Sequence, residues 1–199
     1  MITSHPRRAR QVLLAGTAAL AMLTAPAAQA QGVTPVPGNL EVPVGHSQFL
    51  VAHAYGTQNY ICTHARGGFE WTFFGPQATL FDDGGQQIAT HFLSPNPDES
   101  WKPRATWQDS RDSSATWAVA IESSSDGDFV DPDAIPWLLL RVVGTEEGTF
   151  GGGLLSETTF LQRVNTVGGL APDNGCGRAL DIGIKALVPY AADYIFYKD

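Results

Sequence analysis

Short apolar stretches separated by Gly, Pro, Asp and Ser make up most of the chain, and sustained 3.6-residue periodicity is nearly absent. This pattern is typical of β-strands, in which successive side chains point to opposite faces. In residues 69–74, for example, Phe69, Trp71 and Phe73 would share one face. The pattern predicts strands over residues 49–55, 57–63 (after a break near Gly56), 69–74, 78–81, 87–92, 135–143, 158–165 and 190–197.

Turn residues refine this picture, and one segment stays ambiguous. Asp82-Asp83-Gly84-Gly85 stands between two predicted strands and predicts a hairpin, because Asp-Gly and Gly-Gly tolerate the positive φ angles of tight turns. Residues 135–143 are apolar on both faces, which predicts a central strand, and Pro136 lies near its start, where a missing N–H matters least. Residues 115–122 alternate like a strand but could also form two turns of helix.

Eight or more short strands favour an all-β fold, either a sandwich or a partly closed barrel, in a single domain over residues 31–199. Residues 31–43 are rich in proline and predict an extended arm on the domain surface. The polar segments 94–114 and 123–134 are predicted to be long loops, where binding residues tend to lie. The Gly-rich segment 144–153 predicts a flexible turn.

The first thirty residues have the pattern of a cleavable export signal. Three arginines precede an uncharged apolar run over residues 12–23, and Ala28-Gln29-Ala30 supplies small residues for cleavage after Ala30. The apolar run is well short of the roughly 20 residues that span a bilayer, so we expect a signal peptide over residues 1–30 and no membrane insertion. The mature domain is then periplasmic or extracellular.

The charge balance narrows the range of partners. Export would remove three of the twelve basic residues, so nine would face twenty acidic ones in residues 31–199, a formal charge of −11. Such an acidic chain disfavours nucleic acid and anionic membrane surfaces as partners. The oligomeric state is not readable from the sequence.

Cys62 and Cys176 are the two cysteines of the chain. An exported protein enters a compartment in which disulfides persist, so we expect these two residues to be bonded to each other. Metal ligation is the alternative, but there is no Cys-x-x-Cys spacing and no second pair to complete a site. The bond would be structural, because it closes a loop of more than a hundred residues.

Several short runs stand in fixed order along the mature chain: Ala52-His53-Ala54 with Gly56, Gln58, Tyr60 and Cys62; Ala78-Thr79-Leu80-Phe81-Asp82; Thr90-His91-Phe92; Ile135-Pro136-Trp137-Leu138-Leu139-Leu140; Gln162-Arg163-Val164-Asn165-Thr166 with Gly168-Gly169; and Val188-Pro189-Tyr190 with Ala192-Asp193-Tyr194. Together they resemble the domain of unknown function family numbered 3455. The resemblance implies a secreted bacterial or fungal protein whose activity is uncharacterised at the family level.

Motifs for known chemistry are missing from the sequence. There is no His-Glu-x-x-His, no P-loop, no Gly-x-Ser-x-Gly and no Gly-x-Gly-x-x-Gly between a strand and a helix, so we expect no cofactor. The acidic segment 126–131 begins like a calcium loop, but Asp131 stands where Gly is required and Trp137 where Glu is required. We therefore expect a solvated acidic turn and no metal site.

Two classes of function remain open. The first, which we favour, is a non-catalytic binding or structural module of the cell envelope or secretome, with a small molecule or glycan as ligand. The second is a hydrolase or lyase acting on extracellular polymer, with His53, His91, Asp82 or Tyr60 as acid or base. Either histidine could instead be buried and satisfied by a backbone carbonyl. The candidate ligand-binding residues are His53, Gln58, Tyr60, Asp82, His91 and Arg163.

Two further patterns concern polar and aromatic side chains. Arg163 interrupts a strand-like stretch, where a lone guanidinium would be costly to bury, so we expect a carboxylate partner, first Asp193 and second Asp82. The alternative is that Arg163 faces solvent on an edge strand. Trp101, Trp107 and Trp117 could form a platform for stacking sugars, or they could simply cover the sheet.

Overall fold

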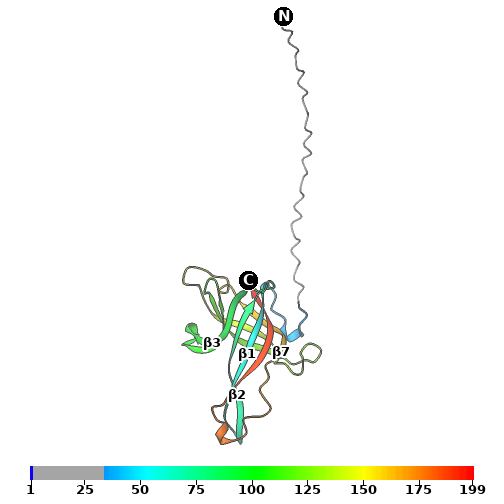
Figure 1. The fold of residues 1–199 in the computed structure, drawn as a ribbon, viewed down its shortest axis with the longest axis vertical. Coiled ribbons are helices and arrows are strands. Elements are labelled where there is room, and N and C mark those ends of the chain that lie inside the picture. Colours follow the sequence, from blue (N-terminus) through cyan, green and yellow to red (C-terminus); the bar gives the residue numbers. More distant parts are fainter. Residues whose placement is uncertain (2–33) are drawn as a thin grey trace. The chain divides into compact units, whose positions relative to one another are not determined.

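Eight antiparallel strands close into a barrel in which each strand pairs with its neighbours in sequence and β1 pairs with β8 (Figure 1). The structure is a computed structural model that describes Met1 and residues 34–199. Residues Pro35–Asp199 form one compact unit. The strands are β1 (Ser47–Ala65), β2 (Gly68–Phe81), β3 (Gln87–Asn96), β4 (Lys102–Asp109), β5 (Ala115–Ser124), β6 (Trp137–Glu146), β7 (Phe160–Gly168) and β8 (Lys185–Lys198).

The all-β prediction is confirmed, and the closed barrel decides between the two architectures left open by the sequence. Residues 115–122, which could also have been helical, belong to strand β5. The predicted hairpin at residues 82–85 joins β2 to β3. The predicted signal peptide over residues 1–30 falls, except for Met1, outside the residues that the structure describes, and it stays a prediction.

Several strands are longer than the sequence pattern predicts. Residues 49–55 and 57–63 form one continuous strand, because Gly56 is not a break but a point where β1 passes very close to β2. A Cβ atom at Gly56 would lie 2.0 Å from the carbonyl oxygen of Gln77. The predicted loop over 94–114 is also wrong, since it contains the end of β3 and all of β4.

Helical structure within residues 34–199 is confined to three 3₁₀ turns, η1 (Gly38–Leu40), η2 (Pro97–Glu99) and η3 (Ala179–Asp181). No helix among the described residues is long and apolar enough to cross a membrane. The predicted N-terminal arm lies against the barrel from Val36 onward, and Leu40 is fully buried there. The backbone carbonyl of Leu40 accepts a hydrogen bond of 2.7 Å from Nε2 of Gln162 on β7.

Alternation along the strands separates two apolar clusters. Ala52 and Ala54 of β1 point inward with Leu161 of β7 and Phe196 of β8, and they belong to the core inside the barrel. A second cluster lies on the outer face under the N-terminal arm and consists of Leu40, Val130, Trp137, Leu139, Val164, Ile195 and Tyr197. Odd and even positions of the same strand therefore face different environments.

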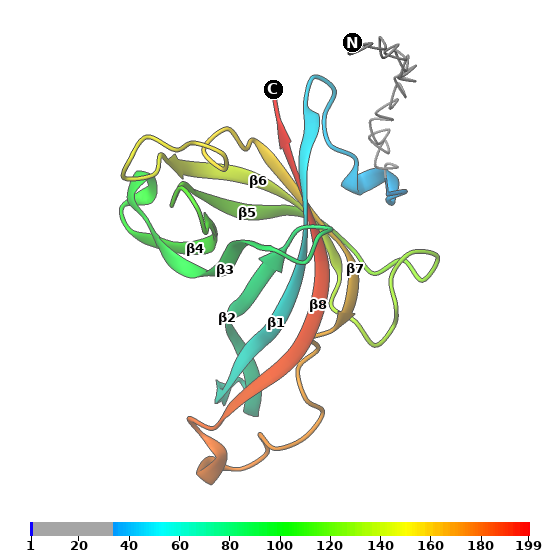
Figure 2. The same ribbon diagram turned by 45° about the horizontal axis from the view of Figure 1, so that its top comes forward.

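Strands β2 and β3 pair over only a short distance and then diverge. Their register runs from Phe81 opposite Gln87 to Ala78 opposite His91 and stops there. Beyond this point β2 continues beside β1, whereas β3 continues beside β4 (Figure 2). The wall of the barrel is therefore interrupted between residues 68–77 of β2 and residues 92–96 of β3.

Cys62 and Cys176 are bonded to each other, as the sequence predicts, with their Cα atoms 5.4 Å apart. The bond fixes the segment between β7 and β8 to strand β1. Two backbone hydrogen bonds support it, because the Cys62 N–H donates to Ile184 and the Gly183 N–H donates to Cys62.

Candidate functional site

A cavity of about 140 Å³ lies inside the barrel. The interior of an eight-stranded barrel is just wide enough for packed side chains or for one small ligand, so an internal cavity is informative. Most of its lining is apolar, but four side chains are polar: Gln58 of β1, His91 of β3, Arg163 of β7 and Tyr194 of β8. The remaining lining residues are Phe73, Pro76, Leu93, Ala105, Trp107, Ala120, Leu138 and Leu140.

Several hydrogen-bond donors around this cavity lack a well-aligned partner. Nε2 of Gln58, Nε1 of Trp107, Nε of Arg163 and the hydroxyl of Tyr194 are buried without a hydrogen bond of good geometry to any described residue, and the Tyr194 hydroxyl makes only weak contacts with Tyr190 and Arg163. The same holds for the hydroxyl of Tyr190 on β8, whose weak hydrogen-bonding contacts are with Tyr194 and Gln58. A buried polar group without a partner costs about 1–3 kcal/mol, so such a cluster calls for an explanation.

Arg163 supplies the positive charge of the cavity. Its Nη2 donates a hydrogen bond of 2.7 Å to the backbone carbonyl of Pro136, and no ion pair joins it to a carboxylate within residues 34–199. Burial raises the pKa of the Tyr194 hydroxyl, and the nearby Arg163 charge opposes that rise. Burial likewise raises the pKa of Tyr190, again opposed by Arg163. Both phenols are therefore neutral donors beside a guanidinium.

His91 is neutral and lies in the aromatic floor of the cavity. Its ring stacks on Trp107 with centroids 4.1 Å apart and meets Tyr194 edge-on at 5.1 Å. Burial lowers the pKa of His91 to about 3. Nδ1 lies 2.8 Å from the carbonyl oxygen of Thr106, and because a carbonyl only accepts, Nδ1 carries the proton. An imidazole this hard to protonate is a poor general base near neutral pH.

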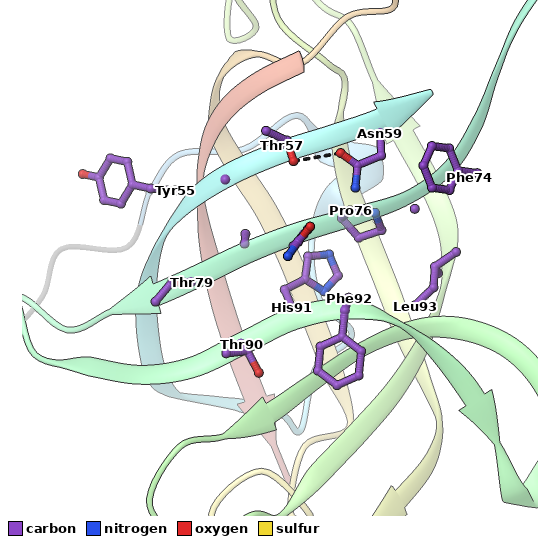
Figure 3. A pocket seen from close by; sticks show the side chains of 14 residues that line it. Tyr55, Thr57, Asn59, Phe74, Pro76, Thr79, Thr90, His91, Phe92 and Leu93 are labelled. Carbon is purple, nitrogen blue, oxygen red and sulfur yellow. Dashed lines mark hydrogen bonds between the residues drawn. The ribbon is translucent and has the colours of Figure 1, made fainter. Parts of the chain in front are cut away.

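A groove of about 730 Å³ on the outside of the barrel adjoins the cavity at the divergence of β2 and β3. Pro76, His91 and Leu93 line both spaces. Figure 3 shows Pro76 on β2 and His91 and Leu93 on β3 gathered between the two strands. The remaining groove residues come from β1, β2 and β3, and include Tyr55, Thr57, Asn59, Phe74, Gln77, Thr79, Thr90 and Phe92.

Comparison with known protein families gives a match over most of the chain. Residues 43–198 match the family described as "Protein of unknown function (DUF3455)". The chain belongs to this family. The family resemblance seen in the sequence runs is thereby confirmed over nearly the whole barrel. No curated protein and no solved structure matches the chain.

The structure brings together only part of the candidate residues of this DUF3455 protein. Gln58, His91 and Arg163 line the cavity. Tyr60 lies beside them, close enough to feel the Arg163 charge, and its hydroxyl donates a 2.7 Å hydrogen bond to the carbonyl of Gly169. His53 and Asp82 lie elsewhere, so the four residues proposed for acid–base chemistry do not share one cleft.

Asp82 organises the hairpin between β2 and β3. Its Oδ1 accepts hydrogen bonds from the backbone N–H groups of Gly84 and Gln86, at 3.0 and 2.9 Å. Its other carboxylate oxygen lies 3.9 Å from the guanidinium of Arg111. These contacts give Asp82 a structural role in the turn, which is the usual reason for an aspartate at such a position.

The predicted ion pair between Arg163 and Asp193 is wrong. In the register of β7 and β8, Arg163 stands opposite Tyr194 and Val164 stands opposite Asp193. Arg163 therefore points into the barrel, whereas Asp193 on the outer face accepts hydrogen bonds from His53 and Asn165. The second choice, Asp82, is wrong too, because its partners are those of the hairpin.

The three tryptophans considered as a sugar platform do not form one. Trp107 is fully buried and Trp117 nearly so, whereas Trp101 is exposed in the connection between β3 and β4. In the acidic segment 126–131, Asp126 accepts a hydrogen bond from the N–H of Asp128, as in an ordinary polar turn. No group of three or more potential metal ligands occurs among the residues that the structure describes.

Sequence reasoning missed Tyr190 and Tyr194 as site residues, and it considered Trp107 only as part of a platform for stacking sugars. A signal for the two tyrosines was present, because positions 190, 192 and 194 of one strand share a face and Ala192 leaves space between the two rings. Nothing in the sequence indicated that Trp107 points into the barrel, since its segment was interpreted as a loop. Its inward orientation became apparent only once β4 was known to be a strand.

On the outer face, His53 connects two carboxylates. Nδ1 lies 2.6 Å from Asp193 and Nε2 lies 2.9 Å from Asp83. The hydrogen bond to Asp83 is the largest cause of a raised His53 pKa, followed by the bond to Asp193, and burial opposes both. The folded state therefore favours the protonated imidazole.

We expect this arrangement to add stability at acidic pH that is lost as the pH rises. The contribution of a group with a raised pKa is complete below its unfolded value of about 6.5 and disappears as the pH passes the raised folded value. Because His53 is one-third exposed, solvent screening limits the effect to about 1 kcal/mol. Urea denaturation of the wild type and of His53→Gln at about pH 5.5 and 8.5 measures it.

The exposed His64, which contacts Phe69, provides the matched control for this prediction. His64→Gln is expected to keep the pH dependence of the wild type, whereas His53→Gln flattens it. Equal pH dependence in the wild type and His53→Gln would contradict the proposed role of the two carboxylates.

Proposed function

We propose that this protein is a non-catalytic binding module that holds a small monocarboxylate inside the barrel. One observation carries the proposal: the unpartnered groups around the cavity are hydrogen-bond donors. Indole Nε1, guanidinium Nε and amide Nε2 only donate, and a phenol hydroxyl can donate. A carboxylate accepts about four hydrogen bonds through its two oxygens and donates none, which complements this set.

Charge supports a monoanion over a dianion. Among the described residues that line the cavity, Arg163 alone carries a charge, and His91 is neutral there. One carboxylate and one guanidinium form a neutral pair, whereas a dianion would leave one uncompensated negative charge in an apolar enclosure, which is costly. A neutral sugar could accept hydrogen bonds through its hydroxyl oxygens, but it would leave the Arg163 charge without a counter-charge. The charge of Arg163 therefore favours a carboxylate over the glycan considered from the sequence.

The test is calorimetric titration of the purified protein with hexanoate and benzoate. Both acids are expected to bind, and hexanol and benzyl alcohol, which have similar shapes without the charge, are expected to bind far more weakly. Arg163→Met should lower the affinity for both acids about a hundredfold, since it removes a charged, partly buried hydrogen-bonding partner.

Arg141→Met is the matched control, because Arg141 lies on the neighbouring strand β6 and is exposed. It removes the same positive charge from the protein without touching the cavity. An equal loss of affinity in Arg141→Met would place the acid on the surface and overturn the proposal. If neither hexanoate nor benzoate binds at millimolar concentration, the proposal is overturned as well.

A further inference from the structure

The volume of the internal cavity sets a limit on what it can enclose. Small-molecule sites usually measure roughly 300–1,000 Å³, and the cavity beside Arg163 measures only about 140 Å³. The groove outside the barrel, at about 730 Å³, falls within that range. A ligand with its polar group at Arg163 therefore has room for the rest of its body only where the cavity meets the groove.

The connection between the two spaces is apolar. Phe73 and Pro76 of β2 and Leu93 of β3 line the cavity where the two strands part. Phe73 and Leu93 are partly exposed, at 47% and 38%, which leaves a large apolar surface at the mouth. Phe74 and Phe92 continue this surface along the groove (Figure 3).

Gly75 keeps the mouth open between Phe74 and Pro76. A Cβ atom at this position would lie 3.0 Å from both Cγ and Cδ1 of Leu93, so any other residue would push against the leucine. The backbone at Gly75 has φ +148°, a conformation that side-chain-bearing residues rarely adopt. Space and conformation both favour glycine at the mouth.

The cavity closes in the other direction. Leu80, Ile88, Leu161 and Phe196 are buried in the core of the barrel, and Phe49 and Leu50 pack against them. A chain entering from the groove would therefore advance as far as Arg163 and stop against a filled core. The direction of binding follows: the charged group is innermost and the apolar part points outward.

We infer that the ligand is an amphipathic carboxylic acid whose hydrocarbon tail passes between β2 and β3 and lies in the outer groove. This inference rests on the proposed carboxylate site and adds the class of ligand. Arg163 and the neighbouring donors hold the head group, whereas Pro76 and Leu93 contact the tail where it leaves the barrel. Phe74 and Phe92 cover the tail beyond that point.

A series of straight-chain acids from butanoate to decanoate tests the inference by calorimetric titration. Burying one methylene contributes about 0.8 kcal/mol, so each added carbon is expected to tighten binding about fourfold until the tail reaches the end of the groove. The corresponding alcohols serve as controls for the head group. They should show the same increments at much lower affinity.

Leu93 and Leu154 are similarly exposed, so their alanine variants form a matched pair. Leu93 at the mouth is 38% exposed, and Leu154 in the connection between β6 and β7 is 41% exposed. Leu93→Ala is expected to weaken decanoate about fivefold and butanoate hardly at all, because only the longer tail reaches the mouth. Leu154→Ala should leave both affinities unchanged.

The outcomes separate the two proposals. If all acids bind with equal affinity and Arg163→Met abolishes binding, the carboxylate site stands and the tail inference is overturned. If no acid binds, or Arg163→Met has no effect, the proposed function itself is overturned. If each added carbon tightens binding to Leu93→Ala as much as it does to the wild type, the tail lies somewhere other than the gap between β2 and β3.

Discussion

Replacing Cys62 and Cys176 together by alanine is expected to lower the free energy of unfolding by about 4–5 kcal/mol. The bond joins residues 114 positions apart, and a cross-link over so long a loop removes a large share of the entropy of the unfolded chain. Chemical denaturation of the wild type and of the double variant measures the difference.

Reduced wild-type protein is the control for this prediction. It should unfold at the same denaturant concentration as the double variant, since both lack the same constraint. A loss below about 1 kcal/mol would show that the native backbone hydrogen bonds of Cys62 with Ile184 and Gly183 suffice to hold the segment between β7 and β8.

The strands of this barrel could be predicted from the sequence because they depend on local alternation. The closure of the barrel could not be predicted, because it depends on pairing between β1 and β8, which are more than a hundred residues apart in the chain. Strand length was underestimated for a local reason. Gly56 interrupts the apolar pattern like a turn, but its missing side chain serves the close approach of β1 to Gln77 and Ala78 of β2.

The face of the strand on which each residue lies explains which site residues were identified correctly. From the sequence alone, His53 and His91 are equally good candidates for the site, since each lies in a predicted strand and in a family-like run. Ala52 and Ala54 face the core, so His53 faces outward and the even-numbered Gln58 faces inward. The sequence does not say which face is the interior until the barrel is closed.

The same argument accounts for the wrong partner of Arg163. Asp193 and Tyr194 are neighbours in sequence on opposite faces of β8, and the face that Arg163 shares is that of the tyrosine. A lone guanidinium in a strand does point to a missing anion. The structure supplies no carboxylate for it within residues 34–199, which is why we assign that role to a ligand.

A binding site whose buried donors lack partners destabilises the ligand-free protein. Each buried donor without a partner lowers the stability of the ligand-free barrel, and it regains a partner only when an acceptor enters. Removing such a donor should therefore stabilise the protein and weaken binding. A donor that already has a protein partner should behave in the opposite way.

Tyr194→Phe is expected to raise the free energy of unfolding of the ligand-free protein by about 1–2 kcal/mol. The substitution keeps the ring packed against Trp107 and His91 and removes a buried hydroxyl that makes no hydrogen bond of good geometry to any described residue. The same variant should bind hexanoate about tenfold more weakly, because a hydrogen bond to a charged group contributes about 1.5–3 kcal/mol. Denaturation and titration measure the two effects separately.

Tyr197→Phe on the same strand is the matched control. The Tyr197 hydroxyl donates a 2.7 Å hydrogen bond to Oε1 of Gln162 on the outer face, so its removal leaves that buried oxygen without its donor. We expect Tyr197→Phe to lose about 1–2 kcal/mol of stability and to bind hexanoate like the wild type. If Tyr194→Phe is destabilised as much as Tyr197→Phe, the Tyr194 hydroxyl has a partner in the empty barrel and is not reserved for a ligand. Opposite changes in the free energy of unfolding for Tyr194→Phe and Tyr197→Phe would distinguish a binding hydroxyl from a structural one.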